Sequence, residues 1–326
     1  MSSVQTRANI FSLFRRGPQR LPMDIMVTLW PSFPHFPVFA NDERLSGIRL
    51  NSAMIGVSEL DREFGMLPKS LPVPLYFDIK GRQLRITEVH DNPDYLDITL
   101  NHPISVVTPT TVLFKAGADN ALLREVREDG KRLLFAGGPH YKVIPGESLH
   151  IRHPSLRVRG EQFTDAEKLK IEKVKKAGFT RYFLSYVENQ RDVDEFLELI
   201  GPHEEVLLKI ENKRGLEYVA KEFKKRDNLR LVAAQGDLYV EIARPHQILP
   251  AMKLIVGKDP RALVGSRMML SVVHEPVPSC ADFEQLAWLY DIGYRSFMLC
   301  DEMCLKEPLL TSATNAICAF RDDYAA

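Results

Sequence analysis

Eight short apolar segments with strand-like composition recur along the chain and constrain its fold more than any other feature. Their carboxyl ends lie near residues 29, 50, 78, 186, 210, 234, 265 and 299. Six of the seven intervals are roughly 20 to 35 residues long, which suits one strand and one helix, and the third is much longer. The pattern predicts an α/β fold, a TIM (β/α)8 barrel with a small all-β domain inserted after the third strand. An open doubly wound sheet is the competing architecture, but no glycine-rich phosphate-binding fingerprint follows any strand.

The long third interval has the composition of short strands joined by turns. Asp-Gly at 129–130 and Gly-Gly at 137–138 are typical turn dipeptides between such strands. After this interval, a capping box at 164–167 opens a helical pattern and the strand–helix alternation returns. We therefore expect an N-terminal arm at 1–21, a barrel formed by 22–85 and 151–326, and an inserted β lid domain at 86–150.

Charge balance and cysteine pattern limit the partners and the compartment. The 326 residues include 43 Lys plus Arg and 43 Asp plus Glu, without the basic excess of most nucleic-acid-binding proteins. The four cysteines form no Cys-x-x-Cys pair and are typical of buried thiols in a reducing compartment. Residues 1–20 lack the apolar core of a secretory signal and are too short for a membrane span. We expect no nucleic-acid or membrane partner and a cytoplasmic location.

The strand predicted at 206–210 ends with two charged residues. Lys209 and Glu211 point to one face of the strand and Ile210 to the other, because strand side chains alternate. Lysine and glutamate are rarely buried without a partner. A metal or a phosphate between them would account for the pattern; the alternative is a strand that has simply reached the surface.

Polar residues end the other predicted strands as well, and in a barrel those ends meet at one mouth. Glu211 and Asp237 come from neighbouring strands and suffice for Mg²⁺, which prefers one or two carboxylates plus substrate oxygens. Arg49, Lys209 and Arg85 supply positive charge for an anionic substrate. The alternative is that these residues only cap helices and form salt bridges. The polar residues at strand ends are Arg49, Asn51, Asp78, Lys80, Ser185, Lys209, Glu211, Asp237, Ser266, Arg267 and Glu302.

Two motifs carry a resemblance to a known family. They are Lys209-Ile210-Glu211-Asn212, followed by Gly215, and Ala234-Gln235-Gly236-Asp237-Leu238. Weaker matches in the same order are Arg49-Leu50-Asn51, Asp78-Ile79-Lys80-Gly81 with Arg85, Phe183-Leu184-Ser185-Tyr186-Val187, and Met298-Leu299 before Glu302. With these motifs, the chain resembles the pyruvate kinase family from about residue 24 to residue 320.

The resemblance implies a role for each matching residue. The family's lysine at Lys209 stabilises the transferring phosphoryl group, its carboxylates at Glu211 and Asp237 bind Mg²⁺ or Mn²⁺, and its arginine at Arg49 contacts phosphate. Positioning and charge neutralisation of this kind suit phosphoryl transfer. The remaining candidates that the resemblance implies are Asn51 and Asp78 for a cation, Gly236, Ser185 and Arg85 for substrate, Lys142 as the lid lysine, and Ser266 or Arg267 where the family has the threonine that helps protonate the enolate.

The chain departs from the family pattern mainly on the side of the nucleotide and of K⁺. Ser52-Ala53-Met54 replaces the segment that holds a K⁺-binding serine and a nucleotide-side histidine, and Ile79 replaces a threonine that binds K⁺. Trp30 replaces a glycine of the first loop and predicts bulk where the nucleotide approaches. The resemblance therefore leaves K⁺ and ADP or ATP open. With a short lid and no C-terminal regulatory domain, we expect a monomer or a dimer.

The sequence thus predicts a pyruvate kinase-like enzyme that catalyses Mg²⁺-dependent phosphoryl transfer involving phosphoenolpyruvate or pyruvate. One alternative is Mg²⁺-dependent enolate chemistry of the lyase or aldolase type on a 2-oxo acid, without nucleotide. A second alternative is an inactive paralogue whose barrel serves as a scaffold.

Overall fold

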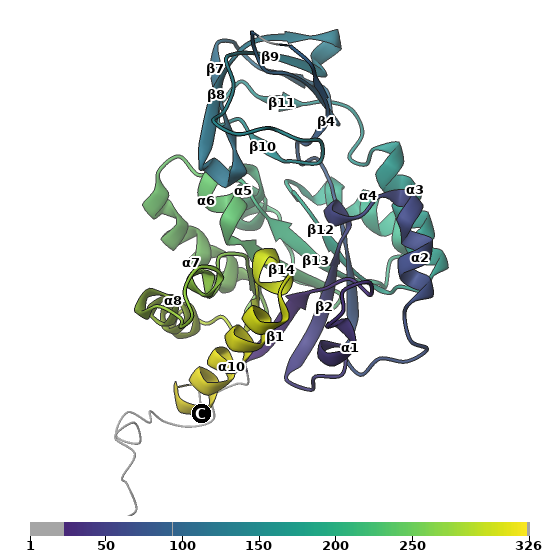
Figure 1. Ribbon diagram of the computed structural model, residues 1–326, viewed down its shortest axis with the longest axis vertical. Helices are drawn as coiled ribbons and strands as arrows, with labels where there is room; N and C mark the ends of the chain where they lie inside the picture. The colour runs from purple at the N-terminus through teal and green to yellow at the C-terminus, as the bar shows by residue number, and fades with distance from the viewer. Residues whose placement is uncertain (1–22, 93, 325–326) are drawn as a thin grey trace, which may run out of the picture.

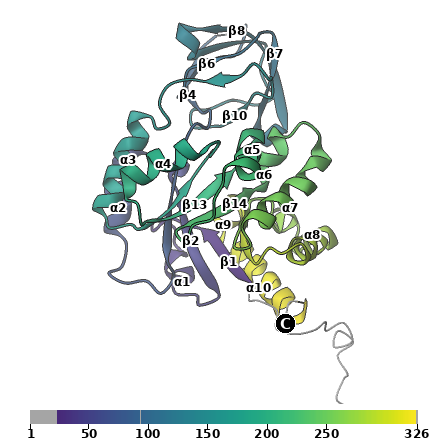
Figure 2. The same cartoon turned by 180° about the vertical axis from the view of Figure 1, so that it is seen from behind.

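A computed structural model describes residues 23–92 and 94–324, so the N-terminal arm predicted at 1–21 lies outside the described residues. Eight parallel strands close into a barrel in the order β1-β16-β15-β14-β13-β12-β3-β2 (Figures 1 and 2). The predicted TIM barrel is therefore confirmed. The barrel strands are β1 (Asp24–Thr28), β2 (Leu45–Asn51), β3 (Leu75–Ile79), β12 (Arg181–Leu184), β13 (Glu205–Ile210), β14 (Leu229–Ala234), β15 (Leu263–Gly265) and β16 (Ser296–Met298).

Helices surround the barrel, and those that follow the first two strands are short, in connections that are rich in proline. Thr164 is the N-cap of the first long helix as predicted, because its hydroxyl accepts a hydrogen bond from the Glu167 amide at 3.3 Å. The predicted capping box is not completed, because the Glu167 carboxylate accepts hydrogen bonds from the Lys80 amide and the Lys170 ammonium instead. The helices are α1 (Phe36–Phe39), α2 (Leu60–Gly65), α3 (Asp165–Lys176), α4 (Gln190–Ile200), α5 (Lys213–Lys221), α6 (Gln235–Glu241), α7 (Ile248–Lys258), α8 (Cys280–Asp291), α9 (Asp301–Cys304) and α10 (Glu307–Tyr324).

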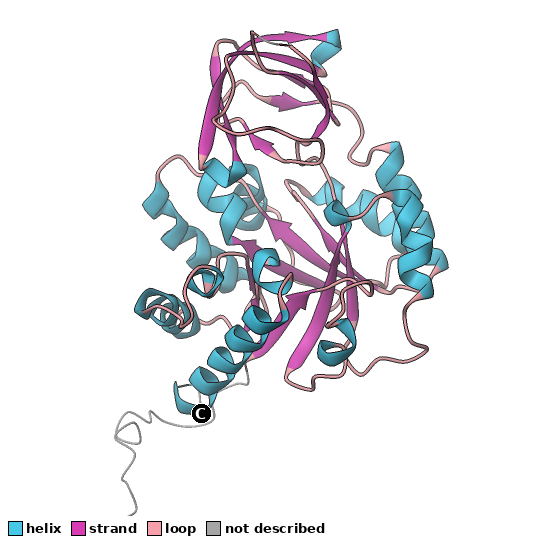
Figure 3. Cartoon of the chain, in the orientation of Figure 1, coloured by secondary structure: helices cyan, strands magenta, loops and turns pink. Residues whose placement is uncertain are grey.

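The inserted part between β3 and α3 is built from antiparallel strands and has its own apolar core (Figure 3). It stands over the carboxyl ends of the barrel strands, because the chain enters it directly from β3. Six strands form one sheet in the order β10-β7-β8-β9-β5-β4, and β11 pairs with β6. Their bounds are β4 (Ile86–His90), β5 (Asp97–Leu100), β6 (Ile104–Ser105), β7 (Thr110–Phe114), β8 (Asp119–Arg127), β9 (Arg132–Ala136), β10 (Leu149–His150) and β11 (Arg157–Val158).

Two apolar layers follow from the alternation of side chains along the barrel strands. One layer fills the barrel interior and consists of Met26, Tyr76, Phe183, Leu207, Val232, Leu263 and Met298. The other lies between the strands and the helices, and on β13 it takes Val206, Leu208 and Ile210. Leu207 therefore faces the barrel axis, and the residues two and four positions later face the mouth.

The structure also bears on what the sequence predicted for the cysteines and for membrane-spanning helices. Cys300, Cys304 and Cys318 are buried free thiols as predicted, but Cys280 is exposed at the start of α8. Among the helices of the described residues, none combines the length and the apolarity that a bilayer crossing needs.

Candidate active site

The barrel mouth contains a cavity of about 290 Å³ above the interior apolar layer. On one side, strand alternation brings charged side chains inward from β2, β3 and β13. On the other side, β14 and β15 present the uncharged residues Val232, Ala234 and Gly265, and the small size of the last two leaves the space open. The cavity is lined by Arg49, Asn51, Lys80, Gln83, Arg85, Ser148, Lys209, Val232, Ala234, Asp237, Gly265, Ser266, Met298, Leu299, Cys300, Asp301 and Glu302.

Lys209 and Glu211 are buried together at the carboxyl end of β13. The Lys209 Nζ atom lies 2.8 Å from Glu211 Oε1 and donates a hydrogen bond to the Ser185 hydroxyl at 3.0 Å. The alternative of a strand that has reached the surface is wrong, because the exposed fraction is 6% for Lys209 and zero for Glu211. Burial alone would lower the pKa of Lys209, but the carboxylates of Asp78 and Glu211 outweigh it and raise the pKa, which keeps the ammonium charged.

Glu211 is held in an environment that disfavours its charge. Its Oε2 atom accepts a hydrogen bond from the Tyr186 amide at 2.6 Å, and its buried Oε1 atom has the Lys209 ammonium as its ion-pair partner at 2.8 Å. Burial raises the pKa of Glu211 to about 7; the ammonium of Lys209 opposes this shift and the nearby Asp237 carboxylate adds to it. Glu211 and Asp237 are therefore close enough to repel each other when both are ionised.

His150 of the inserted part approaches Asp237, a contact that the sequence analysis did not predict. The ring is buried, with Nε2 at 3.6 Å from Asp237 Oδ1 and Nδ1 at 2.6 Å from Glu241 Oε1. The Tyr186 hydroxyl lies 3.3 Å from Nδ1. Burial alone would lower the pKa of His150, but the hydrogen bond with Glu241 and the surrounding carboxylates raise it. His150 thus joins the lid to α6.

Asp78 at the end of β3 is surrounded by cations. Its Oδ2 atom lies 2.7 Å from Lys80 Nζ, 3.5 Å from Arg49 Nη1 and 3.7 Å from Lys209 Nζ. Its Oδ1 atom accepts a hydrogen bond from the Ser185 hydroxyl at 3.0 Å. Burial alone would raise the pKa of Asp78, but the three cations hold it well below its usual range. Burial lowers the pKa of Lys80 to about 7, although Asp78 opposes this shift. Both oxygens of Asp78 are therefore already used by protein groups.

Asp301 at the start of α9 is a second site residue that the sequence analysis missed. It forms an ion pair with Arg49 and accepts a hydrogen bond from the Asn51 amide at 2.7 Å. Asn51 Oδ1 also accepts the Ala53 amide at 3.2 Å, so both ends of this side chain have partners. The only sequence signal was an acidic pair after the eighth strand, of which Glu302 had been singled out.

The loop after β15 brings the next predicted residues to the mouth. The Ser266 hydroxyl lines the cavity and accepts a hydrogen bond from the Gly236 amide at 2.7 Å. A Cβ atom at Gly236 would lie 2.7 Å from that hydroxyl oxygen, so only glycine fits there. Ser266 and Arg267 both adopt a positive φ, which is a strained conformation for residues with a side chain. The Arg267 guanidinium lies 5.0 Å from the Tyr239 ring centroid.

Arg85 and Lys142 differ in position although both were predicted to serve the site. Arg85 lines the cavity, and its guanidinium donates to Gln83 Oε1 at 2.6 Å. Lys142 is exposed and borders a different hollow on the surface of the inserted part, so the described structure does not bring it to the barrel mouth. Trp30 is fully buried and packs edge-on against Phe77, so the prediction that its bulk stands in the nucleotide approach is wrong.

The carboxylates at the barrel mouth suit a divalent cation at Glu211 and Asp237 but not at Asp78. Glu211 lies beside Asp237 with Lys209 as its single cationic partner at 2.8 Å, and burial together with the Asp237 carboxylate raises its pKa. Carboxylate oxygens of this kind are ligands that Mg²⁺ and Mn²⁺ accept. Asp78 does not fit the same role, because Lys80, Arg49 and Lys209 neutralise it. Within the described residues, no cluster of three or more His, Cys, Asp or Glu has metal-binding geometry.

The fold and the site define a TIM-barrel protein with a β lid and a charged cavity at the barrel mouth. No family model matches the chain. It is 25% identical over 251 residues to a pyruvate kinase of Agaricus bisporus, covering 68% of this chain and 46% of that protein. It is 25% identical over 306 residues to a pyruvate kinase of Methanocaldococcus jannaschii, covering 87% of this chain and 66% of that protein.

A solved structure of a pyruvate kinase from Cryptosporidium parvum matches the fold, with a TM-score of 0.74 and 17% sequence identity. That match covers 93% of this chain and 71% of the solved chain. The sequence relatives and the shared fold support a divergent relationship of this chain to the pyruvate kinase family. The chain spans about half to two thirds of the length of those two sequence relatives, at 46% and 66%.

Proposed function

We propose that the chain is a pyruvate kinase-like enzyme whose barrel mouth binds Mg²⁺ or Mn²⁺ together with phosphoenolpyruvate, pyruvate or a related 2-oxo acid. One observation carries the proposal: Lys209 and Glu211 are buried 2.8 Å apart beside Asp237, at the carboxyl ends of the barrel strands. A buried charge cluster is costly unless its charges are paired or bind a ligand. Glu211 and Asp237 would hold the metal ion.

The chain's own side chains suit an anionic substrate next to that metal. Lys209 keeps its proton and presents a fixed positive charge, which stabilises negative charge that develops on a substrate oxygen. Arg49 and Arg85 line the same cavity and favour a carboxylate or a phosphate. When bound, the divalent ion polarises substrate oxygens and neutralises phosphate charge. Ser266 places a hydroxyl at the opposite wall, where it can position a proton near the substrate.

Enolate chemistry without nucleotide is the second candidate, and one observation favours it. Asn51, which the family resemblance assigns to the cation beside the nucleotide, has both ends of its amide engaged by Asp301 and by the Ala53 amide. A nucleotide-associated cation would therefore compete with contacts inside the protein. In this candidate the same metal site and Lys209 act on a 2-oxo acid.

A coupled assay with phosphoenolpyruvate, ADP, Mg²⁺ and K⁺ tests the first candidate. We expect pyruvate formation that depends on ADP and on the divalent ion. No turnover at high enzyme concentration would exclude phosphoryl transfer to ADP and leave the enolate candidate. For that candidate, the measurement is deuterium exchange at the methyl group of pyruvate, followed by NMR in the presence of Mg²⁺.

Thermal unfolding with Mn²⁺ and oxalate tests whether the metal site itself exists. We expect a metal-dependent rise in Tm that Glu211→Gln and Asp237→Asn both remove. Glu205→Gln is the matched control, because Glu205 lies on the same strand but at its amino end, where it contacts Tyr76. A flat response in the wild-type protein would favour the inactive paralogue. Cytoplasmic location and a monomeric or dimeric state stay predictions.

A further inference from the structure

A second cavity, of about 620 Å³, lies at the seam between the inserted part and the barrel. It is separated from the barrel mouth by the His150 ring, whose contacts reach Tyr186 and Glu241 on one side and Asp237 on the other. Tyr186 and Glu241 line the seam cavity, whereas Asp237 lines the mouth. We call this second cavity the seam cleft. The two cavities are therefore neighbours with one buried histidine between them.

Positive charge predominates around the seam cleft. Its cationic side chains are Arg82, Arg152, Arg157, Lys213 and Arg214, and its carboxylates are Glu188, Glu217 and Glu241. Two of these carboxylates are occupied, because Glu241 pairs with His150 and Glu188 pairs with Arg214 at 3.3 Å. Glu217, the one carboxylate of the cleft that is left, cannot balance the charges of Arg152, Arg157 and Lys213.

Three of the cations have no carboxylate partner among the described residues. No ion pair or hydrogen bond is formed by the Arg152 or Lys213 side chains there, and Arg157 donates only to the carbonyl oxygens of Pro154 and Leu156. Arg152 lies between β10 and β11, Arg157 begins β11, and Lys213 begins α5, so the cations come from both the inserted part and the barrel. An anion bound between them would therefore be contacted from both parts of the molecule.

The lower wall of the seam cleft is apolar and aromatic. It is formed by the buried side chains of Leu84, Leu149, Ile151 and Tyr186. The amino end of α5 lies at the same wall, since Asn212 and Lys213 both line the cleft, and the positive end of a helix dipole favours an anion. The cleft thus has one cationic wall and one apolar, aromatic wall. A ligand with an anionic group and an apolar or planar body would contact both walls favourably.

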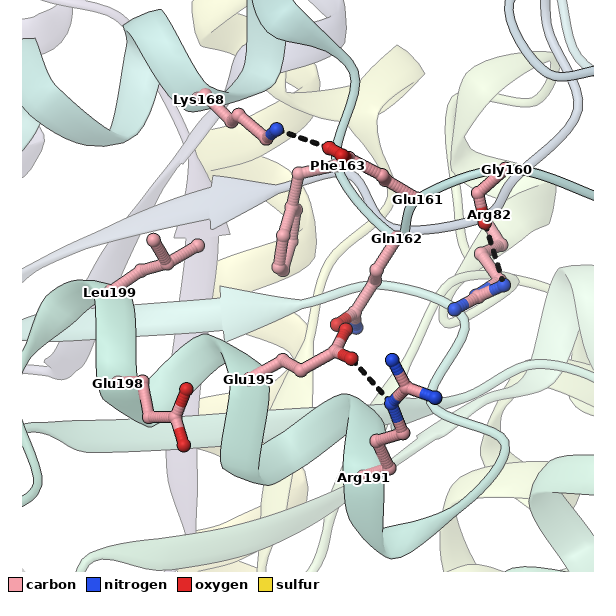
Figure 4. A pocket seen from close by; sticks show the side chains of 10 residues that line it. All are labelled: Arg82, Gly160, Glu161, Gln162, Phe163, Lys168, Arg191, Glu195, Glu198 and Leu199. Atoms are coloured by element: carbon pink, nitrogen blue, oxygen red, sulfur yellow. Dashed lines mark hydrogen bonds and ion pairs between the residues drawn. The ribbon is translucent and has the colours of Figure 1, made fainter.

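A comparable hollow on the same molecule lacks this imbalance (Figure 4). It has a volume of about 610 Å³ and lies where the two connections to the inserted part meet α3 and α4. There the cations are paired: Lys168 binds Glu161, and Arg191 Nε lies 2.5 Å from Glu195 Oε1 (Figure 4). Unpaired cations are thus a property of the seam cleft and not of every hollow on this surface.

We propose that the seam cleft binds a phosphorylated small molecule at a site separate from the barrel mouth. The phosphate groups lie between Arg152 and Lys213, and the rest of the ligand lies on Tyr186 and the apolar wall. Hydrogen bonds from cationic side chains to phosphate are short and strong, which makes such a pair an effective anchor. The proposal depends on the charges and shape of the cleft and does not require the activity proposed above.

Isothermal titration calorimetry without divalent metal and at low ionic strength tests the proposal. The probes are pyrophosphate, which is phosphate alone, and ADP, which adds a planar body. The variant Arg152→Gln/Lys213→Gln removes the two anchors, both of which are exposed and do not contribute to the core. The matched control Lys168→Gln/Arg191→Gln removes two positive charges from the hollow of Figure 4.

We expect both probes to bind the wild-type protein, and ADP to bind tighter than pyrophosphate. The Arg152→Gln/Lys213→Gln variant should weaken binding by at least about tenfold, and the control by less than about twofold. Equal affinity of that variant and the wild-type protein would overturn the proposal, because Arg152 and Lys213 would then not hold the anion. No binding of either probe at millimolar concentration would also overturn it. The Tm response to Mn²⁺ and oxalate should be the same in all three proteins, which separates this outcome from that of the proposed function.

Discussion

The barrel mouth holds two pairs of acidic residues, Asp78 with Asp301 and Glu211 with Asp237, and these pairs differ in how their negative charge is balanced. Around Asp78 and Asp301, lysine and arginine side chains are close enough to lower the pKa of both carboxyl groups despite the burial that opposes this shift. Beside Asp237, burial raises the pKa of Glu211 to about 7, and Lys209 offsets it only in part. Both groups lie at carboxyl ends of barrel strands, yet Asp78 has three cationic partners and Glu211 has only Lys209.

This difference indicates that the two pairs of carboxylates have different roles at the barrel mouth. A carboxylate whose charge the protein leaves unbalanced favours an added cation, whereas one that is already paired holds its neighbours in place. We therefore expect substitutions near Glu211 to change ligand binding and turnover, and substitutions near Asp78 to change stability. The following predictions test that division, from the largest expected effect to the smallest.

Lys209→Met should reduce turnover by about 10³-fold in whichever assay detects activity, because the fixed charge that stabilises the anionic substrate is lost. Steady-state kinetics at saturating metal measures the effect, and circular dichroism checks that the variant is folded. Retention of more than a tenth of the wild-type turnover would show that Lys209 serves only as the partner of Glu211 and Asp78.

Asp78→Asn should lower the free energy of unfolding by about 3–5 kcal/mol at pH 7, because Lys80, Arg49 and Lys209 lose their buried counter-charge. Urea denaturation measures it. The folded-state pKa of Asp78 is lowered, so its contribution is present above the unfolded-state pKa and is lost only as pH falls to strongly acidic values.

The control for that measurement is Asp227→Asn, an exposed aspartate whose loss should change the free energy of unfolding by less than about 0.5 kcal/mol. If the two variants were equally stable, the cluster around Asp78 would not be a structural device, and the contrast between the two acidic groups would fail.

The affinity for Mn²⁺ should rise with pH by up to about tenfold per unit below pH 7 and level off above it, because Glu211 must lose its proton to bind a cation. In the metal-free protein, the contribution of Glu211 to the free energy of unfolding changes with pH in the opposite direction. A raised folded-state pKa stabilises the fold at low pH, and this contribution is lost as pH rises through about 7. Electron paramagnetic resonance of free Mn²⁺ between pH 5.5 and 8.5 measures the affinity; a curve that is flat over that range would contradict the assignment of Glu211.

His150→Asn should weaken Mn²⁺ binding by up to about tenfold with little effect on Tm, because Asp237 loses the ring that lies 3.6 Å from it and limits its movement on the side of the lid. His153→Asn is the matched control, since the His153 ring contacts only the nearby Ser155 at 2.7 Å. An equal change in the two variants would mean that the lid does not position the metal site.

The sequence was informative where short-range physics decides the outcome. The spacing of apolar segments predicted the barrel and the insertion, and the structure confirms both. The period-two alternation predicted that Lys209 and Glu211 share a face, and they lie 2.8 Å apart. The resemblance to the pyruvate kinase family, drawn from the same motifs, is supported by the sequence relatives and by the fold.

The sequence was misleading where a side chain had alternatives that only packing could resolve. Trp30 was expected to stand in the mouth, but its indole packs against Phe77 and its Nε1 donates to the Asn51 carbonyl at 3.3 Å. His150 carries no signal in the sequence that predicts a role at the site, yet the lid brings it to Glu241, 91 positions away along the chain. Asp301 meets Arg49 only because closure of the barrel brings the ends of the first and last strands together.

By itself, the sequence determined which residues can reach the barrel mouth, because alternation along a strand and the spacing of strands are local properties of the chain. Only the tertiary structure decided how their charges are balanced. The pKa of a carboxyl group depends on burial and on cations a few ångströms away, and those cations come from strands that are distant in sequence. Asp78 and Glu211 look alike as acidic residues at strand ends, but the closed barrel surrounds Asp78 with three cations and gives Glu211 only Lys209, so their pKa values shift in opposite directions.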